Sequence, residues 1–349
     1  MSVRSVVLRS LLNLSYHCGG PRARDAWRGG QIRILMYHGV SSEERWDGVV
    51  NAHGYNVSLE VFRRQMAYLA RACQVVSLSD AVTGTRLSRR TTNVVLTFDD
   101  AYDNVYLNAW PLLWQHGFPA LFALPTEFVR EGQPLWNDII EHAVSRCTVP
   151  RVRIAWQESR CEFALHEGSG RLELLDWLLE EGMRMNEAGR AQLMTAMRQA
   201  LDVDVSPEAL FASPDYRPLT PPHLQTLAAS GLVEFASHSV HHAVLTRLAP
   251  PQQREELEES KRHVEELTGQ ACQTFCVPGG VYNDKVLERA FAAGYARVLT
   301  SNPGVADTSR RVLNRTCIFQ EPDLVTFADV AHGPVLEAVQ AVRRSLWRR

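Results

Sequence analysis

A short apolar segment, residues 94–98, runs directly into two adjacent carboxylates, Asp99 and Asp100. A run of this length, rich in β-branched residues, predicts a buried strand. Side chains at the carboxyl end of a strand lie where α/β folds place their chemistry. Burying two neighbouring negative charges costs several kcal/mol unless a cation neutralises them. The segment therefore predicts an α/β fold with a cation near the end of this strand.

A second strand-like segment, residues 233–236, leads through Ser237 to His238, Ser239, His241 and His242. Imidazoles together with a carboxylate are the usual ligands of a catalytic zinc-like ion. Each segment taken alone has another explanation, since paired Asp residues also cap helices and His residues four apart arise incidentally. Both segments at matching strand ends favour a metal site.

Strand-like and helical patterns alternate along most of the chain, which predicts a parallel sheet. The predicted strands are residues 31–38, 75–78, 94–98, 118–124, 233–236, 273–277, 295–299 and 311–314. The predicted helices are residues 59–71, 104–115, 222–230, 251–267, 284–293, 324–331 and 335–346. About seven strands suggest an incomplete barrel, a distorted (β/α)7-type fold, over residues 31–349. Residues 138–216 interrupt the alternation with a small β patch and two helices, and we interpret them as an insertion that could shape a substrate cleft.

The sequence Thr97-Phe98-Asp99-Asp100 and the spacing of His238 and His242 resemble the first two motifs of the polysaccharide deacetylases. This is the NodB-homology, or carbohydrate esterase 4, family, and the resemblance covers residues 31–320. It implies a distorted (β/α) barrel, a divalent metal bound by Asp100, His238 and His242, and Asp99 as general base. It also implies zinc as the first expectation, with cobalt, nickel or iron as alternatives. Three protein ligands leave coordination positions for water and substrate.

Residues 275–283 resemble the third family motif, R-x-P-x-G, with Pro278 and Gly280 in place and Tyr282 following. Cys276 stands where the family has the Arg that pairs with the base. Arg315, at the end of a late strand, could supply a guanidinium from another direction, the alternative being an ordinary surface salt bridge. Ala101 replaces the glycine that usually follows the first motif, which changes the tolerance of that turn for positive φ.

The family usually draws its general acid from an L-x-H motif near the C-terminus, and His332 does not lie in one. Residues 35–40 instead match the L-M-Y-H segment of circularly permuted poly-N-acetylglucosamine deacetylases, which implies His38 as general acid. The alternative is a buried histidine bonded to backbone. Trp136 belongs to a Trp-x-Asp sequence similar to one in the family. Its ring could stack on a sugar or could equally fill the end of the barrel.

Composition limits the class of protein. The chain has 349 residues, a formal net charge of -2, and 45% hydrophobic and 22% charged residues, which is ordinary for a soluble globular protein. This charge argues against nucleic acid as a partner. Seven scattered cysteines without a C-x-x-C spacing favour a reducing compartment. Without a recognisable signal peptide, we expect a cytoplasmic location.

The two chain ends suggest contact with a membrane surface. Residues 1–30 form an N-terminal segment in which residues 3–14 carry an apolar helical stripe with Arg4 and Arg9 beside it, and residues 343–349 are rich in Arg. Such ends could bind anionic lipid reversibly, at the inner face of the membrane. The alternative is that both helices pack on the barrel.

These features lead to one expected activity. We expect metal-dependent hydrolysis of an N-acetyl group from an amino sugar of a polysaccharide or lipid-linked glycan precursor, with release of acetate. Two alternatives remain. One is a related deformylase or non-sugar amidohydrolase of the same fold, and the other is a sugar-binding pseudo-enzyme, which the missing motif Arg would explain. The sequence does not determine the oligomeric state.

Overall fold

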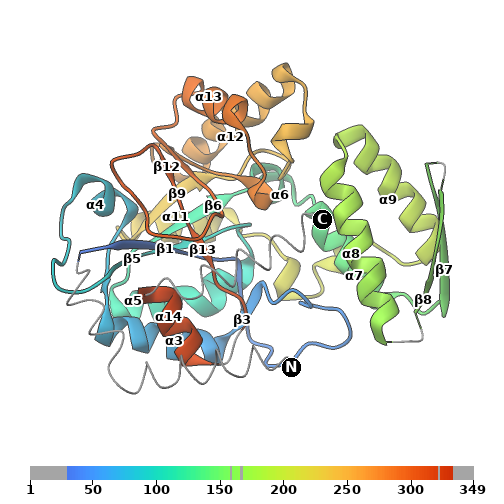
Figure 1. Cartoon of the computed structure of the whole chain (residues 1–349), viewed down its shortest axis with the longest axis horizontal. Coiled ribbons are helices and arrows are strands. Elements are labelled where there is room, and N and C mark those ends of the chain that lie inside the picture. Colours follow the sequence, from blue (N-terminus) through green and yellow to red (C-terminus); the bar gives the residue numbers. More distant parts are fainter. Residues whose placement is uncertain (1–29, 158, 166–167, 321–322, 333–349) are drawn as a thin grey trace.

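The computed structural model describes residues 30–157, 159–165, 168–320 and 323–332 (Figure 1). Its main sheet is parallel throughout and curls into the distorted barrel that the sequence predicts. In spatial order the strands are β12 (Val312–Leu313), β11 (Arg297–Leu299), β10 (Thr274–Cys276), β9 (Val233–Ser237), β6 (Ala120–Leu124), β5 (Asn93–Phe98), β1 (Ile32–Tyr37) and β13 (Thr316–Cys317), with β4 (Gln74–Val75) pairing β5. A separate parallel pair joins β2 (Gly39–Ser41) to β3 (Asn56–Ser58).

The central strands are buried on both faces. All six residues of β1 and all six of β5 are buried, and the two strands pair in register from Ile32 and Asn93 to Tyr37 and Phe98. Strands covered on both faces have nearly continuous apolar sequences rather than alternating ones. This is why the sequence before Asp99 already identifies an inner strand.

The two ends of the sheet meet through the chain itself. β12 and β13 lie at opposite ends of the strand order, yet only Asn314 and Arg315 separate them in sequence. This two-residue connection bridges the gap that would otherwise leave the barrel open. Arg315 therefore stands at the barrel seam, between strands from both halves of the sheet.

Helices pack on the outer face of the curled sheet, in two groups (Figure 1). In one group α3 (Leu59–Ala72) contacts α5 (Trp110–His116) and α14 (Leu324–His332), and in the other α12 (Pro250–Thr268) contacts α11 (Pro221–Ala229) and α13 (Asp284–Ala292). Shorter elements are α4 (Leu78–Thr83), α6 (Thr126–Glu131) and the π-helical turn η1 (Val105–Ala109). The prediction of a strand over residues 75–78 is wrong at its C-terminal end, because β4 ends at Val75 and α4 begins at Leu78. Ser77 caps the backbone N–H of Asp80, and this starts α4 instead.

The segment between α6 and α11 forms a second packed unit (Figure 1). It comprises α7 (Trp136–Arg146), the antiparallel pair β7 (Arg151–Trp156) and β8 (Ser159–Ala164), α8 (Gly168–Arg184), α9 (Glu187–Leu201) and α10 (Pro207–Leu210). Its core side chains include Ile140, Ile154, Leu174, Leu178, Leu193 and Met197. The predicted β patch and two helices are present, and α7 is a further helix that the sequence did not predict. The unit lies in the crossover between β6 and β9, which are neighbours in the sheet.

The predicted terminal helices, residues 3–14 and 335–346, and the Arg-rich end at residues 343–349 lie outside the described residues. Within the described ranges, no helix combines the length and apolar character needed to cross a membrane.

Candidate metal centre and catalytic site

Three predicted metal ligands converge at the carboxyl ends of β5 and β9. Asp100 Oδ1 lies 3.4 Å from His238 Nε2 and 3.3 Å from His242 Nε2, and all three residues are buried. β5 and β9 are the two sheet neighbours of β6, so parallel pairing alone brings their ends together.

The turns that carry these ligands have unusual backbone geometry. Asp100, Ala101, Ser239 and His242 all have φ between 50° and 69°. A non-glycine residue in this left-handed region costs about 1–3 kcal/mol and persists only where its surroundings fix it. At position 101, the alanine adopts the conformation that the family's usual glycine would adopt without cost.

The donor set fits a divalent cation. His238 Nδ1 contacts the carbonyl oxygen of Cys276 at 2.9 Å, so a proton on Nδ1 leaves the Nε2 lone pair facing Asp100. Asp100 Oδ1 is buried and accepts no hydrogen bond within the described part of the chain. Burial lowers the pKa of His242 to about 4, although the charge of Asp100 acts to raise it. The lowered pKa keeps this imidazole neutral at neutral pH. Burial would raise the pKa of Asp100, but His242 and His238 outweigh it and the net pKa is lowered.

Asp99, the predicted base, forms a buried bidentate ion pair with Arg315. The distances are 2.6 Å from Nη1 to Oδ1 and 2.8 Å from Nη2 to Oδ2, and the Arg315 side chain is fully buried. Nε and Nη1 of this guanidinium also donate to the carbonyl of Thr300 and to Thr97 Oγ1. Burial would raise the pKa of Asp99, but the charge of Arg315 outweighs it and the net pKa is lowered. Arg315 is therefore not a surface residue.

Cys276 stands beside this pair rather than replacing it. Its Sγ lies 3.6 Å from Arg315 Nη1, and its backbone carbonyl contacts His238. The family's Arg position thus holds the small side chain of Cys276, and the guanidinium beside it belongs to Arg315 at the barrel seam. The sequence lacked any signal for this distance, because Cys276 ends β10 whereas Arg315 lies in the connection between β12 and β13.

His38, the predicted acid, follows β1, the strand beside β5. Burial lowers the pKa of His38, while Asp100 and Asp99 act in the opposite direction, so its imidazole lies within electrostatic reach of both carboxylates. Its buried Nδ1 has no hydrogen-bond partner among the described residues. The ring packs edge-on against Tyr55, with 4.8 Å between centroids.

His332, the other histidine considered for this role, lies elsewhere. It ends α14, with Nε2 3.3 Å from Cys73 Sγ and its ring beside Tyr68 of α3. The helical layer therefore buries His332 away from the strand ends.

Trp136 lies at the boundary between the barrel and the second packed unit. It begins α7, and its ring packs against Gly182 and under the guanidinium of Arg190, with 4.7 Å from Cζ to the centroid. Its Nε1 donates to the carbonyl of His242 at 3.3 Å. The ring thus packs in the second core, and its Nε1 supports the loop that carries His242.

The residues of the third motif form a tight turn after β10. Gly280 has φ 68°, and a Cβ there would lie 1.9 Å from Ser301 Oγ, so any other residue would strain the backbone and displace this hydroxyl. Pro278 is buried, and Tyr282 is held by a 2.6 Å hydrogen bond from Asn302 Nδ2 to its hydroxyl. These residues shape the turn after Cys276, and the structure gives no contact between them and the Asp and His ligands.

His241 points away from the ligand cluster, as its position between two ligands suggested. Hydrogen bonds to Glu127 and Glu256 raise its pKa to about 10. Glu256, on α12, also accepts from the backbone N–H groups of Val240 and His241. α12 thereby holds the loop that presents His238 and His242.

Three buried polar residues, Tyr102, Asp138 and Arg190, were not among the predicted site residues. The hydroxyl of Tyr102 donates to both carboxylate oxygens of Asp138 at 3.0 Å, and burial, together with Asp100, raises the pKa of Asp138 well above its usual range. Arg190 is buried on α9. The sequence signal for Asp138 was the Trp-x-Asp sequence. The signal for Arg190 was its place on the otherwise apolar stripe of residues 187–201, one of the two helical patterns in the insertion.

Comparison with known proteins shows which family part of the chain resembles. Residues 187–298 match the family model described as polysaccharide deacetylase. This part of the chain is similar to polysaccharide deacetylases. The putative polysaccharide deacetylase YxkH of Bacillus subtilis (strain 168) is 32% identical over 88 residues, which are 25% of this chain and 31% of that protein. The chain therefore matches less than a third of the length of this curated relative.

Solved structures share the fold of this chain. The deacetylase PplD of Streptococcus pyogenes, in complex with acetate, superposes with a TM-score of 0.57 at 19% identity, covering 87% of this chain and 99% of that one. IcaB from Ammonifex degensii gives a TM-score of 0.54 at 17% identity, covering 86% and 98%. The NodB-homology fold is thus confirmed over most of the chain, and the family match includes His238 and His242.

Proposed function

We propose that this protein removes the N-acetyl group from an amino sugar of a polysaccharide or lipid-linked glycan precursor, with release of acetate. The observation that carries the proposal is the buried juxtaposition of Asp100, His238 and His242 beside an Asp99–Arg315 ion pair. The family match and the shared fold support the same reaction class.

The ligand set would hold one divalent ion, with zinc as the first expectation and cobalt, nickel or iron as alternatives. When bound, the ion polarises the amide carbonyl and lowers the pKa of water. Two imidazoles and a single carboxylate leave space for substrate at the same centre.

Asp99 and His38 would transfer the protons of the reaction, as general base and general acid. Asp99 is kept ionised by Arg315, so it can accept a proton from the water that attacks the acetamide carbon. His38 would protonate the nitrogen of the departing amino sugar. The lowered pKa of His38 makes its protonated form a stronger acid, and the nearby carboxylates stabilise that form.

Acetate release by the purified full chain tests the activity. The assay uses N-acetylated oligosaccharides and lipid-linked N-acetyl sugars, before and after chelation, with Zn²⁺, Co²⁺ or Ni²⁺ added back. We expect acetate to appear, to stop on chelation and to return with metal. Formate instead of acetate from the corresponding formylated sugar would favour the deformylase, and sugar binding without turnover would favour the pseudo-enzyme.

Metal content tests the ligand assignment separately. His238→Ala should lose the bound ion that the unchanged chain retains, while His332→Ala, a matched change at a buried histidine outside the site, should keep it. Equal metal in all three proteins would rule out the ligand set.

A further inference from the structure

Tyr55 is an exposed aromatic residue beside the proposed acid. It is 46% exposed, and its ring centroid lies 4.8 Å from that of His38, with an interplanar angle of 62°. His38 is itself only half-buried, so the two residues together lie at the solvent boundary beyond the carboxyl end of β1. Binding sites are commonly lined by aromatic side chains with a polar tip, so a ring exposed beside a reaction centre is a candidate for contact with substrate.

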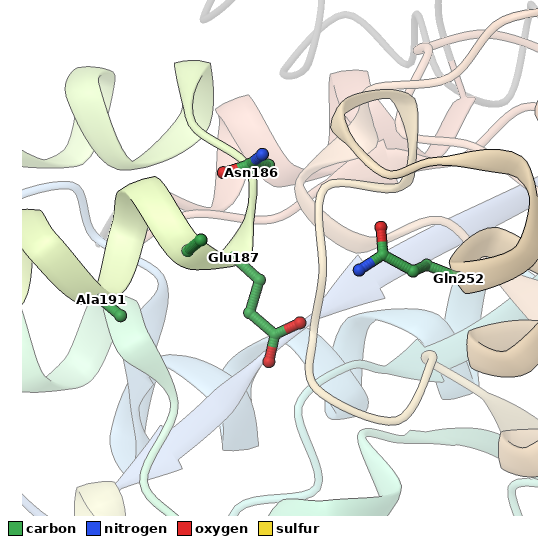
Figure 2. A pocket seen from close by; sticks show the side chains of 5 residues that line it. Asn186, Glu187, Ala191 and Gln252 are labelled. Atoms are coloured by element: carbon green, nitrogen blue, oxygen red, sulfur yellow. The ribbon is translucent and has the colours of Figure 1, made fainter.

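Other hollows and exposed rings of the described residues lack this combination. Trp114 is 58% exposed, but it lies on α5 in the outer helical layer, where it packs against Trp110. A cavity of about 310 Å³ between α9 and α12 is lined by side chains that include no aromatic ring, namely Asn186, Glu187, Ala188, Ala191 and Gln252 (Figure 2). Of these three places, Tyr55 alone joins an exposed ring to a proposed catalytic residue.

Hydrogen bonds fix the backbone on both sides of Tyr55. Asn51 Nδ2 donates to the carbonyl of Asn56, and Asn51 Oδ1 accepts from the N–H of Asn56, each at 2.8 Å. Gly54, at φ 72°, donates its N–H to the carbonyl of Asn51 at 2.8 Å, and its own carbonyl accepts from the N–H of Gln320 at 2.7 Å. The loop therefore presents the Tyr55 ring from a defined position.

Two further contacts place this ring relative to the barrel and to the second packed unit. Phe319, which follows β13, lies 5.6 Å from Tyr55 between ring centroids, at an interplanar angle of 50°. His53, in the same loop, has its Nε2 2.9 Å from Asp176 Oδ1 on α8. A binding group that is already ordered loses less conformational entropy when a ligand arrives. Both parts of the molecule thus contribute to the position of Tyr55.

This position suits the sugar in the proposed reaction. A general acid must come within about 3 Å of the atom that it protonates. Here that atom is the departing nitrogen, which is bonded directly to a carbon of the sugar ring. A side chain in contact with His38 therefore lies within reach of the sugar that carries the amine. One face of a pyranose ring exposes mainly C–H groups, which pack against an aromatic face, while a phenol hydroxyl can bond to a sugar hydroxyl.

We propose that Tyr55 is a specificity-determining residue whose ring stacks on the amino sugar that undergoes deacetylation. The preferred substrates are then N-acetylated sugars in the cyclic form rather than open-chain acetamides. The inference rests on the proposed deacetylation and deepens it by naming a residue that binds the sugar ring. Tyr55 contributes to binding, and His38 remains the acid.

Saturation-transfer NMR with the chelator-treated full chain tests binding without turnover. The probe is the tetramer of N-acetylglucosamine, and a titration gives its Kd. We expect Tyr55→Leu to bind the tetramer at least about threefold more weakly, and Tyr55→Phe, which keeps the ring, to bind it nearly as well as the unchanged chain. In the unchanged chain the sugar-ring protons should receive saturation together with the acetyl methyl group. Tyr55→Leu should lose the signal of the ring protons preferentially.

Matched controls separate ring stacking from other effects. Trp114→Leu removes an exposed ring from another face, and Gln252→Ala alters the cavity of Figure 2, so both should leave the Kd unchanged. If Tyr55→Leu does not fold, Tyr55→Gln gives the same test with a side chain suited to an exposed site. An unaltered Kd in the variant without the ring, an equal loss in Tyr55→Phe, or no binding of the tetramer by the unchanged chain overturns the proposal.

Turnover with metal restored separates sugar binding from an effect on the acid. Loss of binding that is equal in the ground state and the transition state raises KM and leaves kcat nearly constant. We expect this result for Tyr55→Leu, whereas a merely structural role through His38 would lower kcat and shift its pH profile, and that outcome overturns the proposal. Absence of acetate release with intact, Tyr55-dependent sugar binding would reject the proposed reaction and leave the sugar-binding role standing. Acetate release with an unaltered KM in Tyr55→Leu would do the reverse.

Discussion

Replacing Arg315 with methionine should destabilise the protein strongly. The change leaves the Asp99 carboxylate, which is 2% exposed, without its bidentate partner, and leaves the carbonyl of Thr300 without a donor. Removing one member of a buried ion pair costs about 3–5 kcal/mol, because the remaining charge is desolvated and uncompensated. That is a large part of the roughly 5–15 kcal/mol by which a domain is stable.

The dependence of this loss on pH has a definite sign. The folded pKa of Asp99 is lowered, so its ionisation stabilises the protein above the unfolded value of about 3.9 and ceases to do so as pH falls through the folded pKa. In Arg315→Met, burial is no longer opposed by the guanidinium, and the ionised carboxylate becomes unfavourable instead. The difference in stability between the two proteins should therefore be largest near neutral pH and shrink below about pH 4.

Urea unfolding of the chelator-treated proteins measures both effects through a double-mutant cycle. Arg315→Met, Asp99→Asn and the double variant are compared with the unchanged chain. Because the double variant buries no lone charge, its cost should be smaller than the sum of the single costs, with a coupling energy of about 0.5–3 kcal/mol. Additive costs, or a loss in Arg315→Met that stays constant between pH 7 and pH 3.5, would refute this account of the ion pair.

Three further predictions concern the site. Asp99→Asn should lower acetate release by about 10²–10⁴-fold while metal content stays unchanged, because a positioned base contributes that much; near-normal turnover would exclude Asp99 as the base. His38→Ala should show a similar loss with metal retained, and His332→Ala should stay active; the reverse result would assign the acid to His332. Gly182→Ala would bring a Cβ within 2.5 Å of the Trp136 ring, so we expect a loss of about 1–3 kcal/mol in urea unfolding and weaker metal binding. Unchanged metal affinity would show that Trp136 does not support the His242 loop.

The sequence predicted those features that arise from local patterns. Residues 94–98 are apolar because β5 is buried on both faces, so both the strand and the carboxylates at its end could be predicted. Matching strand ends also predicted that Asp100 would lie near His238 and His242. These inferences need only periodicity and parallel pairing.

Features that depend on how separate elements meet could not be predicted. The proximity of Arg315 to Asp99 depends on the closure of the barrel at β12 and β13, and a two-residue connection leaves no pattern in sequence. Trp136 was ambiguous because its neighbour, Gly182, lies on another helix. Arg190 interrupts an apolar stripe, but only the tertiary structure shows that no carboxylate among the described residues pairs with it.

The placement of the second packed unit bears on how such a protein can diversify. Residues 136–216 leave the barrel after β6 and return before β9, two strands that pair directly. Lengthening a connection whose ends are already fixed costs little, about 0.6 kcal/mol for each doubling of a flexible loop. Selection could therefore replace this unit while the strand ends bearing Asp100 and His238 kept their register. We propose that reaction chemistry and substrate choice are then inherited separately, so that exchanging residues 136–216 between relatives would change the sugar that the proposed activity accepts.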